Sequence, residues 1–138
     1  MSQTVLVIDD DLDVLDAMHV ILSLEGYDVR CAHDGFEALA MLAEGLAPSL
    51  VITDMMMPDL TGSDVLTSMR EEPELRNIPV VLTTAAAELA APKGVTTLYK
   101  PFSVEELLAV VAAHLGALAM DGRVTLSPDV PVEKVSAA

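Results

Sequence analysis

Five side chains that could perform chemistry stand at the ends of short apolar runs in this sequence. They are Asp9, Asp10, Asp54, Thr84 and Lys100. An Asp carboxylate is a competent nucleophile for phosphoryl transfer. Such a transfer depends on positioning and charge neutralisation more than on acid–base chemistry. If the fold brings these residues together, one of the three carboxylates could accept a phosphoryl group.

The three carboxylates also indicate a divalent cation. Like charges about 4 Å apart repel by about 4 kcal/mol per pair at an effective dielectric of about 20. A dry site without a cation would keep some of the carboxyl groups protonated. One Mg²⁺ and the ammonium of Lys100 would balance the three negative charges. Mg²⁺ suits such a site because it binds through one or two carboxylates and keeps water and phosphate oxygens as its other ligands.

Short β-rich runs alternate with helical patterns along most of the chain. The predicted strands cover residues 5–8, 27–32, 50–53, 80–83 and 96–99. Apolar residues at helical spacing predict helices that end near Gly26, Gly45 and Glu72. A last helix begins at Ser103, where Ser-Val-Glu-Glu has the spacing of a capping box. The alternation predicts an α/β fold with a doubly wound, mostly parallel sheet.

The predicted sheet would bring the five side chains to one edge. In sheets of this kind the ligand site lies beyond the carboxyl ends of the strands. Taken singly, each residue also has an ordinary structural interpretation. The pair Asp9 and Asp10 could cap the helix that follows, Thr84 could simply favour a strand, and Lys100 could be surface charge. Their common position at one edge favours a functional site.

Composition and charge narrow the classes of function. The chain has 138 residues, of which 52% are hydrophobic, with two Tyr, two Phe and no Trp, so we expect one compact domain with an aliphatic core. A formal net charge of −15 disfavours binding to nucleic acids and to anionic membranes. The single cysteine, Cys31, allows no intrachain disulfide, and the N-terminus has no signal-peptide pattern, so a cytoplasmic location is expected.

Four sequence blocks resemble the response-regulator receiver domains of two-component signalling, and the chemotaxis regulators among them. The blocks are VLVIDDD from Val5, VITDMMMPDLTG from Val51, PVVLTTA from Pro79 and YKPF from Tyr99. The resemblance extends over residues 4–118. It implies a flavodoxin-like fold with a five-stranded parallel sheet in the order 2-1-3-4-5.

The resemblance assigns roles to four residues around a metal ion. Asp54 would be the aspartate that accepts the phosphoryl group. Asp10 would bind Mg²⁺ directly, whereas Asp9 would do so mainly through water. The backbone carbonyl of Met56 would be a further metal ligand. Mg²⁺ is therefore the implied cofactor, with Asp54 both acceptor and ligand.

At the last two strands the resemblance implies a switch, with one departure from the family pattern. Thr84 would close its hydroxyl on the phosphoryl oxygens. Lys100 would pair with Asp54 and then with the phosphate, and its peptide bond to the following proline would be cis. Family members often carry an aromatic residue three positions before the lysine, where this chain has Thr97. The aromatic residue here is Tyr99, which we expect to point to the opposite side of its strand from both neighbours.

A second departure is the short connection between the fourth and fifth strands. Only residues 85–95 are available, so at most about two helical turns fit, and we expect this segment to be the most mobile part of the domain. We expect the receiver domain to cover residues 1–120. Residues 121–138 lose the apolar periodicity and contain two prolines, which predicts a loosely ordered tail or a linker stub.

The implied function is a phosphorylation-dependent signalling switch. A sensor histidine kinase or a histidine phosphotransfer protein would supply the phosphoryl group, and a downstream protein or effector domain would read the result. The domain would promote its own phosphorylation and dephosphorylation without turning over an external substrate. A homodimer is left open.

Three other functions compete with this one. A receiver-like module could bind partners without phosphorylation. A flavodoxin-like cofactor binder would need a loop rich in glycine and hydroxyl groups after the first strand, where this chain has three aspartates. A Mg²⁺-dependent phosphatase with an aspartyl intermediate would carry a second Asp two residues after the nucleophile, where this chain has Met56.

Overall fold

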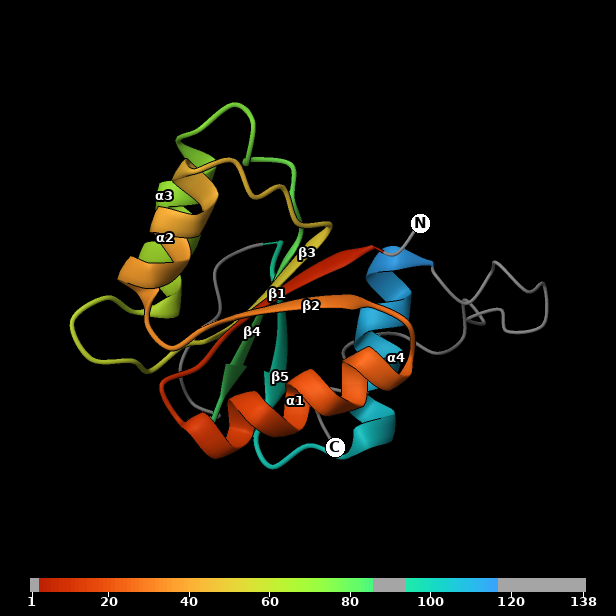
Figure 1. The fold of residues 1–138 in the computed structure, drawn as a ribbon. Helices are drawn as coiled ribbons and strands as arrows, with labels where there is room; N and C mark the ends of the chain where they lie inside the picture. Colours follow the sequence, from red (N-terminus) through yellow and green to blue (C-terminus); the bar gives the residue numbers. More distant parts are fainter. Residues whose placement is uncertain (1–2, 86–93, 117–138) are drawn as a thin grey trace.

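The computed structural model describes residues 3–85 and 94–116 (Figure 1). The strands are β1 (Thr4–Ile8), β2 (Asp28–Ala32), β3 (Leu50–Asp54), β4 (Val80–Thr84) and β5 (Thr96–Tyr99). The helices are α1 (Leu12–Leu24), α2 (Gly35–Ala43), α3 (Gly62–Arg70) and α4 (Val104–Leu115). The expected short crossover falls largely on residues 86–93, and the expected tail falls on residues 121–138. Both lie outside the described residues.

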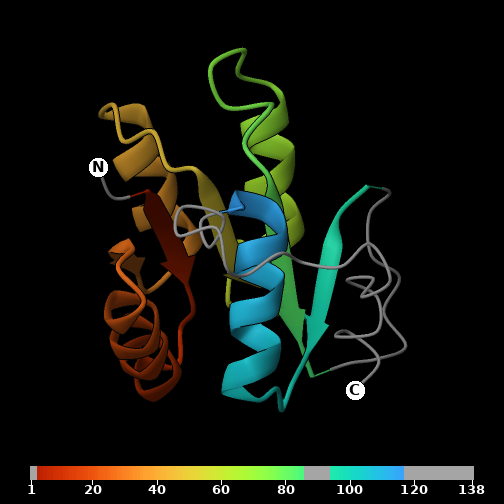
Figure 2. The same ribbon diagram turned by 90° about the vertical axis from the view of Figure 1, so that its right-hand side faces the viewer.

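The strands form one parallel sheet in the order β2-β1-β3-β4-β5, which confirms the predicted α/β fold and strand order. Helices α1 and α4 cover one face, and α2 and α3 cover the other (Figures 1 and 2). From β1 the chain crosses outward to β2, and from β3 it crosses in the opposite direction to β4 and β5. The carboxyl ends of β1 and β3 therefore flank the topological switch point.

The central strands β1, β3 and β4 are buried on both faces, and the core is aliphatic as predicted. On β1, Val5 and Val7 pack with α1 and α4, whereas Leu6 and Ile8 pack with α2 and α3. This alternation follows from the two-residue period of a strand. Because helices cover both faces, the central strands are mainly apolar, and the buried polar residues of β3 and β4 lie at their carboxyl ends.

Some element boundaries differ from the sequence prediction by one or two residues. Asp54 and Thr84 are the last residues of β3 and β4, where the prediction had placed them just after the strands. The predicted second strand began at Tyr27, but the strand begins at Asp28, and the third helix ends at Arg70, before the predicted Glu72. Such shifts are expected at element ends, where hydrogen bonding changes over one turn.

The predicted start of the last helix is confirmed. The hydroxyl of Ser103 accepts from the Glu106 amide at 3.0 Å, and the Glu106 carboxylate accepts from the Ser103 amide at 2.8 Å. A second capping box, of Thr61 and Asp64, begins α3. None of the helices among the described residues is long and apolar enough to cross a membrane.

Cys31, the single cysteine, lies half-buried at the edge of the core. Burial raises the pKa of its thiol, and the charges of Asp16 and Glu37 raise it further. Because the thiolate is the reactive form, this environment disfavours a reactive cysteine.

Candidate functional site

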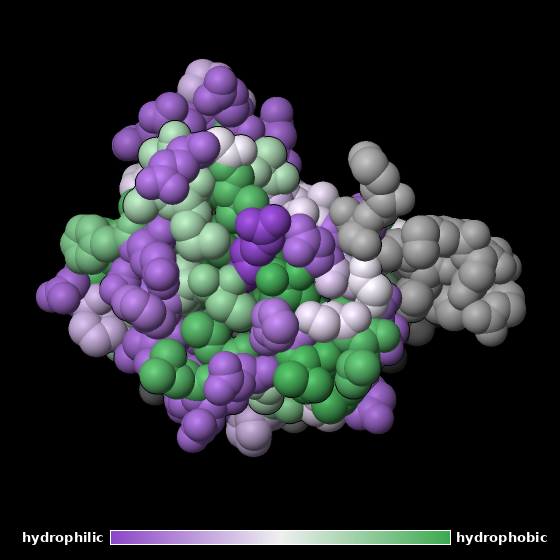
Figure 3. Space-filling model, in the orientation of Figure 1, coloured by the Kyte–Doolittle hydropathy of each residue, from purple (hydrophilic) through white to green (hydrophobic). Residues whose placement is uncertain are grey.

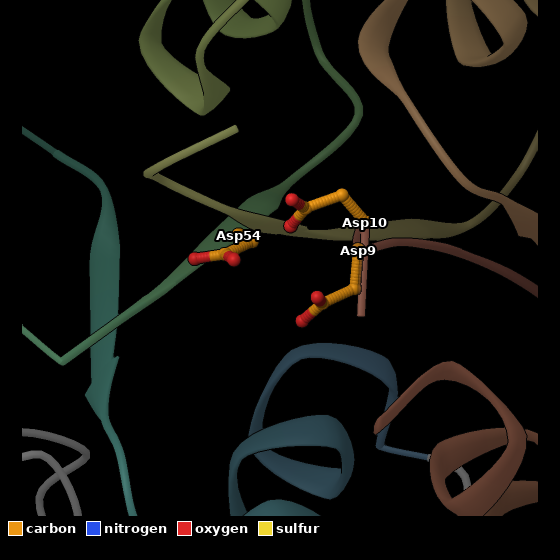
Figure 4. Close-up of side chains that lie close together, drawn as sticks. All are labelled: Asp9, Asp10 and Asp54. Carbon is orange, nitrogen blue, oxygen red and sulfur yellow. The ribbon is translucent and has the colours of Figure 1, made fainter. Parts of the chain in front are cut away.

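Three carboxylates meet at the carboxyl ends of β1 and β3. One oxygen each from Asp9, Asp10 and Asp54 lies within 4.8 Å of the others. Figure 4 shows the three side chains reaching from these two strand ends into one space. Asp9 is buried, with 1% of its surface exposed, Asp54 is 7% exposed, and Asp10 is exposed. The fold therefore brings the predicted metal residues together, with Asp10 on the solvent side.

The turn between β1 and α1 explains why these two aspartates are available. The N-cap of α1 is Asp11, whose carboxylate accepts from the amides of Asp13 and Val14. The Asp11 amide in turn donates to Asp9 Oδ1 at 2.9 Å. The capping role considered for Asp9 and Asp10 thus falls to the third aspartate of the run.

Lys100 reaches this cluster from the end of β5. Its Nζ donates to Asp9 Oδ2 at 3.0 Å and lies 3.4 Å from Asp54 Oδ2. Its backbone amide donates to the Thr84 carbonyl at 2.8 Å, and its peptide bond to Pro101 is cis, as the resemblance implied. The expected pairing with Asp54 is present, and the shorter contact is with Asp9.

The pKa values of Asp54 and Lys100 depend on burial and on the charge that each group places on the other, and these two effects act in opposite directions. Burial raises the pKa of the Asp54 carboxyl and Asp9 raises it further, although Lys100 and the Met56 amide pull it down. Burial alone would lower the pKa of Lys100, but the hydrogen bond to Asp9 and the charges of Asp54 and Asp9 raise it overall. The ammonium is therefore held protonated beside a carboxylate whose charge is costly. This is the environment in which added positive charge would be favourable.

The loop after β3 holds the Asp54 carboxylate from the other side. The Met56 amide donates to Asp54 Oδ1 at 3.3 Å. The Met56 side chain is exposed, so any role of this residue at the site belongs to its backbone. Its predicted role as a carbonyl ligand stays a prediction.

Gly62 is a structural residue of the site that no sequence pattern singled out. A Cβ at Gly62 would lie 2.6 Å from the Asp54 carbonyl oxygen and 3.0 Å from Met55 Cα. The Gly62 amide donates to the Met55 carbonyl at 3.1 Å. The first residue of α3 therefore packs directly on the backbone at the end of β3, at a distance that only glycine allows.

Thr84 and Tyr99 are paired in register at the ends of β4 and β5. Thr84 is 2% exposed, and Tyr99 is partly exposed. Leu98 packs in the core on the α1 and α4 face, so the alternation of the strand places Thr97 and Tyr99 on the opposite face. This agrees with the orientation expected for Tyr99, and it sets an aromatic ring beside the strand position of Thr84.

The residues present fit a Mg²⁺ ion. The cluster offers oxygen ligands alone, which are the ligands Mg²⁺ prefers. Three carboxylates face one ammonium, so a divalent cation would bring the local charge to balance. The exposed Asp10 leaves the cluster open to solvent, as a metal that keeps several waters requires.

A model of the response regulator receiver domain family matches residues 5–112. The chain belongs to this family. Among solved structures, the receiver fold is similar to the chemotaxis protein CheY4 of Vibrio cholerae, at 29% identity and a TM-score of 0.74, over 83% of this chain and all of that chain.

Two further structures extend the comparison. A response regulator receiver domain protein from Clostridium thermocellum is 27% identical, with a TM-score of 0.73. The match covers 86% of this chain and 98% of that chain. The response regulator TrrA from Thermotoga maritima, in complex with Mg²⁺-BeF, is 27% identical, with a TM-score of 0.73, over 82% of this chain and 99% of that chain.

Proposed function

We propose that this receiver domain is a phosphorylation switch in which Asp54 accepts a phosphoryl group in the presence of Mg²⁺. The placement of Asp54 carries the proposal. Its buried carboxylate ends β3, belongs to the cluster with Asp9 and Asp10, and lies 3.4 Å from Lys100 Nζ. The similar TrrA structure is a complex with Mg²⁺-BeF, which supports the same chemistry.

The proposed step is a displacement at phosphorus. An oxygen of Asp54 forms a bond to phosphorus while the bond to a phosphohistidine nitrogen of the donor breaks, and the electron pair leaves with the imidazole. A bound Mg²⁺ would neutralise charge on the phosphoryl oxygens. Asp9 and Asp10 would hold that ion together with the Met56 carbonyl. Lys100, already within reach of Asp54, would pair with the new phosphate.

Thr84 would transmit the change to the sheet. It ends β4 next to the acceptor strand, where Asp54 is in register with Thr83. A hydroxyl that donates to a phosphoryl oxygen would shift the end of β4. The Lys100 amide is bonded to the Thr84 carbonyl, so β5 would follow that shift. This route requires no aromatic residue at position 97.

An apolar groove beside the site supports a protein as the phosphoryl donor. It has a volume of about 410 Å³ and lies between α1 and the start of α4, with Val14, Ile21, Phe102 and Val104 in its wall. Lys100 also lines it, so a helix docked there would end close to the acceptor. The donor would be a sensor histidine kinase or a histidine phosphotransfer protein.

The wider role follows from the family. Receiver domains work with histidine kinases and effectors, and we propose that this one changes its binding to a downstream protein or effector domain. It would act on its own carboxylate and not on an external substrate. We further propose a receiver domain over residues 1–120 followed by a linker-like segment, a cytoplasmic location, and a homodimer as one form of output.

Intact mass spectrometry after incubation with acetyl phosphate and Mg²⁺ tests the proposal. The wild-type chain should gain one phosphoryl group, and Asp54→Asn should gain none. Asp13→Asn removes an exposed carboxylate outside the cluster and serves as the control that keeps the modification. Labelling that persists in Asp54→Asn would contradict the assignment. No labelling of the wild-type chain would favour the module that works without phosphorylation.

A further inference from the structure

A second groove lies between α2 and α3, away from the acceptor site. Its volume is about 490 Å³. Leu39 and Leu42 of α2 and Leu75 of the α3–β4 connection form its apolar side. Leu42 is 5% exposed, and the other two are partly buried against the same core cluster. The groove therefore has a firm apolar floor, because its walls are anchored in the core.

The opposite wall of this groove is acidic. Glu71, Glu72 and Glu74 line it, and all three are exposed. Within residues 3–85 and 94–116, none of the three carboxylates makes an ion pair. Arg70 and Arg76 belong to the same stretch of chain but do not line the groove. Figure 3 shows hydrophilic residues gathered over the α3–β4 connection at the top of the view.

Helix ends add to this negative charge. Helices α2 and α3 both end at the top of Figure 1, with Glu44 and Glu71 as their C-caps. A helix C-terminus carries about half a negative charge, and acidic residues there are unfavourable. The acids around the groove therefore oppose the two helix dipoles. They weaken the folded state slightly, and a cationic partner would remove that cost.

We propose that the groove between α2 and α3 binds a basic segment of a partner protein, in which Lys or Arg residues flank a short aliphatic run. The aliphatic side chains would lie on Leu39, Leu42 and Leu75, and the cations would face Glu71, Glu72 and Glu74. A hydrated metal ion would gain nothing from the apolar floor, whereas an uncharged apolar ligand would gain nothing from the acids. A segment with both chemistries uses the whole groove.

The position of the groove separates it from the switch. Helix α2 ends before β3 begins, so the groove lies toward the amino ends of the strands, whereas Asp54 lies at the carboxyl end of β3. Binding should therefore not require phosphorylation, and the proposal does not rest on the function proposed for Asp54. The partner would hold the receiver in place in either state of the switch.

A labelled peptide tests the groove directly. The probe is a fluorescein-labelled RRLLIRR peptide, and RRSSSRR is its matched control. We expect the first peptide to bind and to shift the amide signals of Leu39, Leu42 and Leu75 in nitrogen–proton correlation spectra. Equal binding of the serine peptide would show that only net charge matters and would overturn the proposal. If Ca²⁺ or spermine shifts these amides and neither peptide does, the groove binds a small cation and the proposal is wrong.

Charge-matched variants separate this groove from the general acidity of the chain. Changing Glu71, Glu72 and Glu74 together to Gln should weaken peptide binding at least ten-fold, which corresponds to about 1.4 kcal/mol. The control changes three exposed acids elsewhere, Asp16→Asn with Glu25→Gln and Glu105→Gln. It should weaken binding by no more than two- to three-fold. Similar losses in both triple variants would contradict the proposal.

A stability measurement gives a readout without any peptide. Ala43 is the last residue of α2 and lines the groove. Ala43→Lys places a cation at a helix C-terminus beside the acids, so it should raise the melting temperature and abolish peptide binding. Ala43→Gln, of similar size and without charge, should do neither. If both variants melt alike, the acids and the helix C-termini do not weaken the folded state as proposed.

Discussion

The ammonium of Lys100 donates to Asp9 at 3.0 Å, across 91 residues of sequence, and this contact ties the end of β5 to the end of β1. Asp9 is buried, and its other carboxylate oxygen accepts from the Asp11 amide. Lys100 thus compensates the buried charge of Asp9 without any phosphoryl group present. Asp54, at 3.4 Å from the same ammonium, is held less closely.

Removal of that ammonium should therefore affect both folding and phosphorylation. Lys100→Met leaves Asp9 with less compensation, so without Mg²⁺ we expect the free energy of unfolding to fall by about 1–3 kcal/mol. Urea titration measures this. The double variant Asp9→Asn with Lys100→Met removes both charges and should be less destabilised than the sum of its single variants. Additive losses would show that the contact contributes nothing.

Mg²⁺ should stabilise the folded chain, because the cluster proposed to bind it exists only in the native state. At ten times the dissociation constant the gain is about 1.4 kcal/mol, seen as a rise in the melting temperature. Asp10→Asn should fold normally, since Asp10 is exposed, but should lose most of this rise. Asp13→Asn is the matched control. An equal response in all three proteins would place the ion elsewhere.

Most of the fold and the main residues of the site were predictable because they depend on local patterns. Apolar runs mark the buried strands, and parallel strands bring their carboxyl ends to one edge. That argument is sufficient to group Asp9, Asp10, Asp54, Thr84 and Lys100. A pattern of this kind gives no distances between side chains, so it could not show that Lys100 lies nearer to Asp9 than to Asp54.

Three further features depend on packing that one sequence does not reveal. Any of three consecutive aspartates could have capped α1, and only the geometry of the turn selects Asp11. Gly62 looks like an ordinary loop residue, and its role depends on the approach of α3 to the backbone of β3. The family pattern also says nothing of the groove between α2 and α3, which depends on side chains from two separate elements.

Gly62→Ala should therefore disturb the surroundings of Asp54 without replacing any charged residue. The added methyl would lie 2.6 Å from the Asp54 carbonyl oxygen, so we expect a loss of about 1–3 kcal/mol in the free energy of unfolding. Amide signals of Asp54 and Met55 should shift. Thr67→Ala, at an exposed position of the same helix, is the control and should change little. A Gly62→Ala protein as stable as wild type would show that α3 can move away freely.

His114 should make stability depend on pH. Burial lowers the pKa of this imidazole in the folded state, where Nε2 lies 3.1 Å from Thr96 Oγ1. The unfolded chain therefore binds a proton first as the pH falls below about 6.5, and stability is lost there by at most about 1.4 kcal/mol per pH unit. Above that pH both states are neutral and the contribution is complete. His114→Gln should flatten this part of the curve, whereas exposed His19→Gln should not.

Tyr99 should report the closure of Thr84, because the two residues are in register at the ends of β5 and β4. The chain has two tyrosines and no tryptophan, so Tyr27→Phe leaves Tyr99 as the only tyrosine fluorophore. In that variant, beryllofluoride with Mg²⁺ should change the tyrosine emission, and adding Thr84→Ala should reduce the change. With Tyr27 kept and Tyr99→Phe introduced, emission should not respond, because Tyr27 is buried in the core on the α1 side. If Tyr99 emission stays constant on activation, the structural change does not pass through Tyr99. The variant Thr97→Tyr then tests whether an aromatic residue at the usual family position restores the fluorescence response.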